Sequence, residues 1–230
     1  MLDRLKREVY EANIALVKSG LVTLTWGNVS GISRADGKIV IKPSGVDYEK
    51  LTVADMVIVD LNGNVVEGKY LPSSDTPTHV LLYNVFQTIG GIAHTHSTSA
   101  TMFAQACREI PCLGTTHADH FNGPVPVTRF LTEAEVNDDY ESNTGKIIVE
   151  RFTSLNAAST PSVLVAGHAP FSWGRDASES VKNAIALENI AQMAFGTLQL
   201  NPGISELPRY ILEKHFNRKH GPKAYYGQKK

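Results

Sequence analysis

The sequence predicts an α/β sandwich built around a largely antiparallel sheet. Short strand-like segments are joined by hairpin-type turns, and longer segments with helical periodicity lie between and around them. The composition of the 230 residues, 42% hydrophobic and 20% charged, is typical of a globular protein with one large core. No Pro/Gly/Ser-rich linker interrupts the chain, so we expect residues 1–230 to form a single domain.

The first third of the chain predicts one helix followed by paired strands. Apolar residues recur at helical spacing from Leu2 to Val17, and Gly20 ends that helix. Ala35-Asp36-Gly37 and Asn62-Gly63 have the residues of hairpin turns. The predicted strands cover residues 21–25, 29–33, 38–42, 56–61 and 64–66.

Further helices then alternate with two buried strands. Thr76 is the expected N-cap of a helix that has Pro77 at its first position and reaches about residue 86. Asp176 is the expected N-cap of a long helix that ends near Leu200. One strand runs into His94 and His96. The remaining predictions are a strand at 162–166 and helices that follow Ser97, begin at 132, cover 144–155 and cover 209–219.

Charge and composition exclude several classes of protein. The formal net charge is −1, so nothing indicates a nucleic-acid or acidic-membrane partner. Cys107 and Cys112 are too few for a disulfide framework and are interpreted as reduced thiols. Residues 1–6 lack the apolar core of a signal peptide, and no run of about 18 apolar residues occurs. We therefore expect a cytoplasmic protein without a membrane span.

Two histidines at i, i+2 are the first candidates for metal ligands. Side chains two residues apart lie on the same face of a strand, so His94 and His96 point to one place. His168 follows another buried strand, and three histidines with an open position form a catalytic zinc arrangement. Asp75, just before a helix, is a candidate oxygen ligand. The alternatives are ordinary packed or surface histidines and, for Asp75, a plain N-cap carboxylate.

Three loops of small residues are candidate anion-binding sites. They are Gly27-Asn28, Ser44-Gly45, which follows Lys42, and Ser73-Ser74, which precedes a helix. Small residues let backbone N–H groups approach an anion, and a helix N-terminus favours negative charge. Each loop is alternatively a simple turn, but together they suit a phosphate.

A polar loop and the C-terminal segment carry candidate proton-transfer groups. Residues 115–121 lie between glycine and proline breaks, and the carboxylate of Asp119 is suited to general acid–base work. His215 and Tyr226 also donate or accept protons. The alternatives are an ordinary loop and a solvent-exposed tail.

Six short motifs occur in the order in which the class II aldolase/adducin family carries them. They are residues 25–30, 41–46, 72–79, 92–97, 114–119 and 223–228. The chain resembles the pentulose-phosphate epimerases of this family from end to end. The resemblance implies a three-layer α/β/α sandwich with a mainly antiparallel central sheet, and a cyclic homotetramer with sites at subunit interfaces. It further implies interconversion of L-ribulose 5-phosphate and D-xylulose 5-phosphate with Zn²⁺ or another divalent transition metal, by cleavage and re-formation of the C3–C4 bond.

The resemblance also assigns roles to individual residues. The positions that match metal ligands are Asp75, His94, His96 and His168. Those that match substrate and phosphate contacts are Gly27, Asn28, Lys42, Ser44, Gly45, Ser73 and Ser74. Thr115, Glu141 and His215 match accessory positions near the site. Asp119 and Tyr226 match the two acid/base residues.

The chain departs from the family's motifs at a few positions. Around His168 the family has His-Ser-His-Gly-Pro, whereas this chain has Ala166-Gly167-His168-Ala169-Pro170. Thr98-Ser99 replaces Arg-His, and His120 replaces tyrosine. These departures bear on the substrate more than on the reaction class. A sugar-phosphate aldolase that releases its fragments is the alternative, although its relatives carry a longer glutamate at the position of Asp75. A non-catalytic scaffold of the adducin type is a further alternative, but it has no use for an open metal site.

Overall fold

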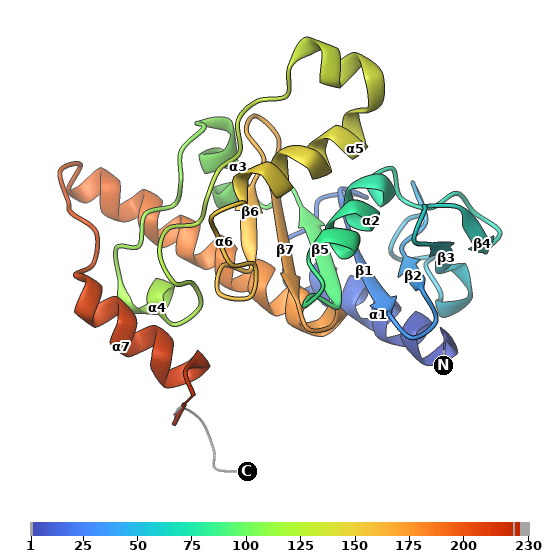
Figure 1. Cartoon of the computed structure of the whole chain (residues 1–230), viewed down its shortest axis with the longest axis horizontal. Helices are drawn as coiled ribbons and strands as arrows, with labels where there is room; N and C mark the ends of the chain where they lie inside the picture. The colour runs from blue at the N-terminus through green and yellow to red at the C-terminus, as the bar shows by residue number, and fades with distance from the viewer. Residues whose placement is uncertain (1, 223, 226–230) are drawn as a thin grey trace.

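The computed structural model describes residues 2–222 and 224–225. Within these residues a seven-stranded sheet runs in the order β4-β3-β2-β1-β5-β7-β6 (Figure 1). All neighbouring strands are antiparallel. The strands are β1 Gly27–Ser33, β2 Lys38–Ile41, β3 Val57–Asp60, β4 Val65–Glu67, β5 Gly91–Thr95, β6 Ser162–Leu164 and β7 Pro170–Gly174.

Helices precede, separate and follow these strands. They are α1 Leu2–Lys18, the 3₁₀ turn η1 Val53–Asp55, α2 Thr76–Val85, α3 Thr98–Gln105, α4 Thr115–Ala118, α5 Glu133–Arg151, α6 Ala177–Leu200 and α7 Arg209–His220. None of the described helices is long and apolar enough to cross a lipid bilayer.

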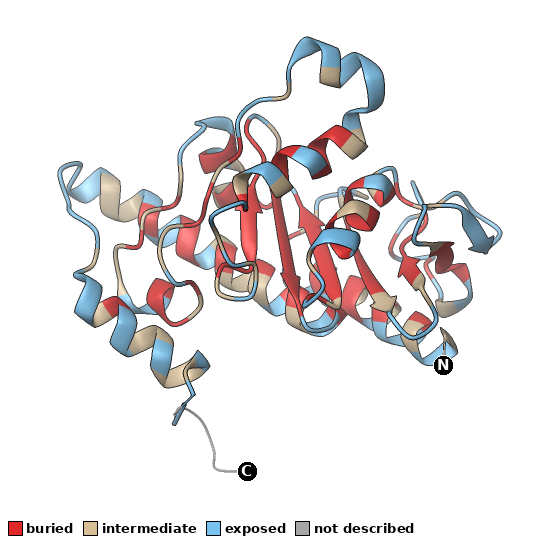
Figure 2. Cartoon of the chain, viewed as in Figure 1, coloured by how far each residue is buried: buried red, intermediate tan, exposed pale blue. Residues whose placement is uncertain are grey.

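The alternation of side chains along the strands divides the core into two faces. In β2, Ile39 and Ile41 pack with side chains of α2 and α5, whereas Val40 packs with side chains of α1 and α6. Figure 2 shows the resulting pattern, in which most of the sheet is buried, the edge strand β4 is exposed, and the helices expose their outer faces. Helices therefore cover both faces of the sheet, and the predicted three-layer α/β/α sandwich with an antiparallel sheet is confirmed.

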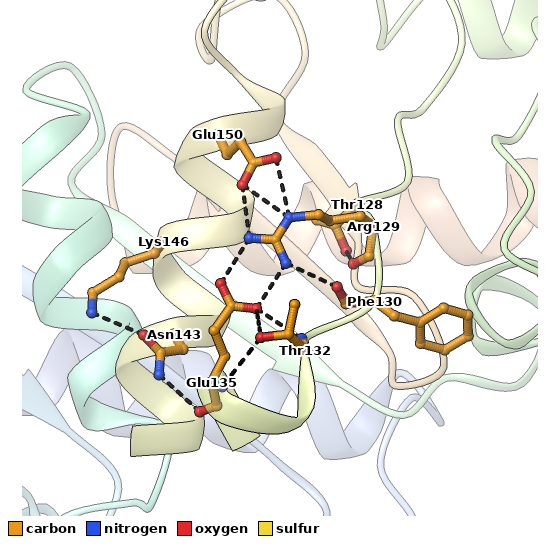
Figure 3. A network of polar contacts seen from close by, with 8 residues as sticks. All are labelled: Thr128, Arg129, Phe130, Thr132, Glu135, Asn143, Lys146 and Glu150. Carbon is orange, nitrogen blue, oxygen red and sulfur yellow. Dashed lines mark hydrogen bonds and ion pairs between the residues drawn. The ribbon is translucent and has the colours of Figure 1, made fainter. Parts of the chain in front are cut away.

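A polar network fixes the start of α5 (Figure 3). Thr132 accepts a hydrogen bond from the backbone of Glu135, whose carboxylate accepts one from the Thr132 backbone, which is a capping box. Arg129 lies between Glu135 and Glu150, with N···O distances of 2.8 and 2.9 Å. Farther along, α5 is interrupted at Asp139, whose φ and ψ of −149° and 90° are not helical. The network thus anchors a helix whose second half begins beside the candidate site.

Several details differ from the sequence-based expectations. Residues 21–25 are not a strand, because the chain turns at Leu24, where φ is 56°. Gly27 and Asn28 begin β1 and do not form a turn. Asp75, not Thr76, occupies the N-cap position of α2, and its side chain makes no capping hydrogen bond.

Gly91, the first residue of β5, is a position at which a larger side chain should destabilise the fold. A Cβ atom on Gly91 would lie 2.3 Å from backbone atoms of Asp176, at the start of α6. We expect Gly91→Ala to lower the free energy of unfolding by about 2 kcal/mol or more, because backbone cannot yield as a side chain does. Gly196→Ala is the control, since nothing lies within 4 Å of its Cβ position on α6. Gly196→Ala should raise the free energy of unfolding by about 0.5–1 kcal/mol, because alanine has a higher helix propensity than glycine. Urea unfolding measures both, and equal effects would contradict this packing.

Candidate active site

Strand register brings the central residues of the site together. Asn28 of β1 pairs with His94 of β5, and His94 pairs in turn with Phe171 of β7. All three are on the face of the sheet that α2 and α5 cover, because Ile92 and Phe171 pack in that core. His96 lies just beyond the end of β5, and His168 lies in the turn between β6 and β7. The site is therefore assembled at one end of adjacent strands.

The three histidines form one cluster. The ring centroids of each pair are 5.0 Å apart. One ring nitrogen from each residue lies within 4.8 Å of the others. Nε2 of His94 is 3.2 Å from Nε2 of His96. A tetrahedral zinc ion with Zn–N bonds of about 2.0 Å would hold nitrogens about 3.3 Å apart. The spacing fits a divalent transition metal.

Hydrogen bonding and burial favour the ligand form of these rings. Nδ1 of His94 donates to the carbonyl of Pro170 at 3.0 Å, which leaves a lone pair on Nε2. Burial, followed by the neighbouring imidazoles, lowers the pKa of His168 to about 4. Burial and His94 also lower the pKa of His96. The imidazoles of His96 and His168 are thus neutral at physiological pH, as metal ligation requires. Nδ1 of His168 is buried without a hydrogen-bond partner among the described residues.

A carboxylate of α6 fixes the chain immediately after these ligands. Ser97 stands at the N-cap position of α3, but its side chain makes no capping hydrogen bond. Glu188 instead accepts from the backbone N–H of Ser99 at 2.7 Å and of Ala100 at 3.0 Å. These are N–H groups that a helix start leaves unsatisfied, and a negative charge there is favourable. Glu188 therefore holds the segment that follows His96.

Asp75 lies in the same cavity but not within the three-histidine group. Its carboxylate accepts a hydrogen bond from the side-chain amide of Asn28 at 2.6 Å. Burial alone would raise the pKa of Asp75, but the neighbouring histidines and the hydrogen bond from Asn28 together outweigh it, and the pKa is lowered. The group is therefore an ionised carboxylate beside the histidines. Its direct ligation of a metal stays a prediction.

The predicted anion loops line this cavity, which has a volume of about 400 Å³. The lining includes these residues from the sequence-based set: Gly27, Asn28, Lys42, Ser44, Gly45, Ser73, Ser74, Asp75, His94, His96, Glu141 and His168. Gly27 has a φ of 124°, and a Cβ there would lie 2.8 Å from the His94 carbonyl oxygen. Only glycine fits that position. Burial lowers the pKa of Lys42 to about 8, and the charge of Asp47 opposes this shift.

The other predicted residues are not part of this cavity. Thr115, Asp119 and His215 belong to α4, its C-terminal end and α7, which lie side by side at one end of the molecule (Figure 1). Arg218 donates to both carboxylate oxygens of Asp119, at 2.9 and 2.6 Å, and His215 lies 3.1 Å from one of them. Burial would raise the pKa of Asp119, but the bonds from Arg218 and His215 lower it overall. Tyr226 lies outside the described residues.

Two aromatic residues in the lining were not predicted. Tyr140 precedes Glu141 and has its ring centroid 6.2 Å from that of His168. The ring of Trp26 is at the same centroid distance from that of His96.

Asp139 accepts hydrogen bonds from the backbone and hydroxyl of Ser142, and so caps the second half of α5. This Asp-x-x-Ser spacing was the available signal that a helix begins anew beside the site.

Comparisons with known proteins agree with this geometry. Residues 7–195 match the Class II Aldolase and Adducin N-terminal domain. The proteins named L-ribulose-5-phosphate 4-epimerase UlaF from Salmonella typhi and Salmonella paratyphi A are each 54% identical over 228 residues, which cover 99% of this chain and 100% of theirs. The solved structure of an L-fuculose 1-phosphate aldolase superposes with a TM-score of 0.74 at 27% identity, over 94% of this chain and 95% of that one. The chain belongs to the class II aldolase and adducin family.

Proposed function

We propose that this protein is a zinc-dependent L-ribulose-5-phosphate 4-epimerase, an isomerase that interconverts L-ribulose 5-phosphate and D-xylulose 5-phosphate. The observation that carries the proposal is the cluster of three histidines opening onto a cavity lined by small residues and Lys42. Relatives that match over their full length and are named L-ribulose-5-phosphate 4-epimerase support this choice of substrate. We further propose that residues 1–230 act as one catalytic domain in the cytoplasm.

The chemistry of the substrate explains why such a site is needed. Carbon 4 of the ketose bears no acidic proton, so simple deprotonation does not invert it. Carbon 4 is inverted when the C3–C4 bond is cleaved and the enediolate fragment adds back to the opposite face of the aldehyde. A bound Zn²⁺ would supply Lewis-acid stabilisation of the negative charge that develops on the ketose oxygens. His94, His96 and His168 would hold the ion, with Asp75 as a further candidate ligand.

The small-residue loops would retain the phosphorylated fragment during the reaction. The aldehyde fragment carries the phosphate, and it must turn without leaving. Backbone N–H groups near Gly45 and Ser74, together with the ammonium group of Lys42, would hold the phosphate while the carbonyl rotates. Binding through the phosphate keeps the fragment close to its partner, which makes re-addition effectively intramolecular.

The predicted proton-transfer residue Asp119 does not line the described cavity of one chain. Asp119, an ionised carboxylate anchored by Arg218, is proposed as one acid/base residue, and Tyr226 as the other. Because Asp119 lies among α4 and α7 and not in the lining, we propose that a neighbouring subunit supplies it, with Thr115 and His215 near it. A cyclic homotetramer with sites between subunits would satisfy this arrangement.

An aldolase that releases its fragments is the second candidate, and the resemblance to the L-fuculose 1-phosphate aldolase structure favours it. Incubation with L-ribulose 5-phosphate separates the two activities. The epimerase produces D-xylulose 5-phosphate while free aldehyde stays at background, because the phosphate end is retained. Accumulation of aldehyde in step with loss of substrate would identify the aldolase instead.

The metal proposal predicts the composition of the purified protein. We expect about one Zn²⁺ per chain, and His96→Ala should lose both the metal and turnover, since two imidazoles remain where three are needed. His120→Ala is the control for metal content, because His120 lies next to Asp119 and outside the cluster. Metal analysis by mass spectrometry measures both variants. Full metal retention by His96→Ala would remove this site from consideration.

The acid/base proposal predicts a loss of rate without a loss of metal. Asp119→Asn keeps the shape of the side chain but not its charge, so turnover should fall by about 10²-fold or more. Zinc content should stay near that of the unchanged protein, whereas the unfolding midpoint should fall, because asparagine does not pair with Arg218 as a carboxylate does. Undiminished turnover would dismiss Asp119 as a proton-transfer group.

Mixing two inactive variants tests which subunit supplies the carboxylate. In hybrids of His96→Ala and Asp119→Asn chains, some sites would combine an intact histidine cluster with an intact Asp119 from the neighbour. Turnover should therefore reappear on co-refolding. Mixtures as inactive as their components would show that both groups act within one chain.

A further inference from the structure

Tyr48 lies behind the anion loops and was not among the predicted site residues. It follows the Ser44-Gly45 loop, is 8% exposed, and belongs to the core between the sheet and α1. It is not in the cavity lining, so it does not meet a ligand there. Among the described residues, however, the hydroxyl and the ring of Tyr48 contact Gly27 and Lys42, which both line the cavity.

The hydroxyl of Tyr48 reaches the first anion loop. It donates a hydrogen bond to the carbonyl oxygen of Gly27 at 2.8 Å. Burial raises the pKa of Tyr48, so the phenol keeps the proton that this bond requires. Gly27 immediately precedes Asn28, whose amide donates to Ser73 and Asp75 at 3.1 and 2.6 Å. The bond therefore fixes the backbone from which the Asn28 side chain projects.

The ring of Tyr48 reaches the second anion loop. The ammonium nitrogen of Lys42 lies over the ring, 4.6 Å from its centroid. The same ammonium group donates to the carbonyls of Val46 at 2.9 Å and Pro43 at 3.2 Å. The ring and the two carbonyls together fix the position of this ammonium group, and Lys42 lines the cavity.

The third loop is tied to the second by backbone alone. The N–H of Ser73 donates to the carbonyl of Lys42, and the N–H of Ser44 donates to that of Leu71, both at 3.0 Å. The first loop begins β1, whose ladder to β2 includes the pair Ser30 and Ile41, close to both loops, and Asn28 also donates to Ser73 of the third loop. In addition to this pairing, the side chain of Tyr48 contacts both Gly27 and Lys42 directly.

We propose that Tyr48 is a positioning residue of the phosphate site, which sets the spacing between Gly27-Asn28 and the loop that carries Lys42. The inference rests on the proposed function, because it takes the three loops as the place where the substrate phosphate binds. A loosened first loop would weaken phosphate binding and leave the histidine cluster unchanged. Tyr48 would thus act on substrate affinity and not on the chemical step.

Tyr48→Phe in the zinc-loaded enzyme tests the proposal, because it removes the hydroxyl and retains the ring over Lys42. Tyr10→Phe is the matched control, since Tyr10 of α1 packs against the same core cluster. Inorganic phosphate is the probe, and its dissociation constant is measured from the rise in melting temperature with phosphate concentration. KM and kcat for L-ribulose 5-phosphate are measured alongside.

We expect Tyr48→Phe to raise both the phosphate dissociation constant and KM by about fivefold to tenfold, the effect of one lost hydrogen bond. Its kcat and zinc content should stay within about twofold of the unchanged enzyme, and Tyr10→Phe should alter none of these values. Unchanged phosphate affinity in Tyr48→Phe would overturn the proposal, as would a fall in kcat alone or equal effects in both variants. If the unchanged enzyme does not convert L-ribulose 5-phosphate, the proposed function fails, and the phosphate titration still decides the role of Tyr48.

Discussion

The position of β5 inside the sheet, between β1 and β7, is the constraint on which the site depends. This strand is buried along its whole length and pairs with β1 on one side and β7 on the other. Its register sets Asn28, His94 and Phe171 side by side, and the Phe171 ring stacks on that of His94 with centroids 4.2 Å apart. A shift of one residue would turn His94 to the opposite face of the sheet. Both the histidine cluster and the Asn28 amide therefore follow from strand pairing.

Two groups of lining residues, the histidines with Asp75 and the loop with Lys42, give the two ends of the cavity different charges. Desolvation keeps the imidazoles of His96 and His168 neutral, and Asp75 beside them is held ionised. That end suits a divalent cation. At the other end, Lys42 carries most of its charge at neutral pH despite its lowered pKa of about 8, and the neighbouring loops present backbone N–H groups. A phosphorylated ketose chelated through its oxygens would bridge the two ends, which is why one small cavity suffices.

Local sequence patterns predicted most of the helices and strands, whereas they did not predict contacts between segments that are distant in the sequence. The α1 helix, the β1–β2 hairpin and the capped start of α6 were predicted because periodicity and turn residues specify them. The strand β7 was not predicted, since proline and glycine at its ends, Pro170 and Gly174, obscure its pattern. Within the site, the i, i+2 spacing of His94 and His96 was a weak signal by itself, and His168 after a second buried strand strengthened the prediction of a metal site. The separation of Asp119 from the cavity depends on the docking of α7, and no local pattern encodes it.

The central claim is that the three imidazoles share one divalent ion. A crystal of the purified protein, measured on both sides of the zinc absorption edge, tests it most directly. The account predicts a single anomalous peak per chain, at about 2.0–2.1 Å from one ring nitrogen of each of His94, His96 and His168. A peak at another place, or rings turned away from a common centre, would contradict it.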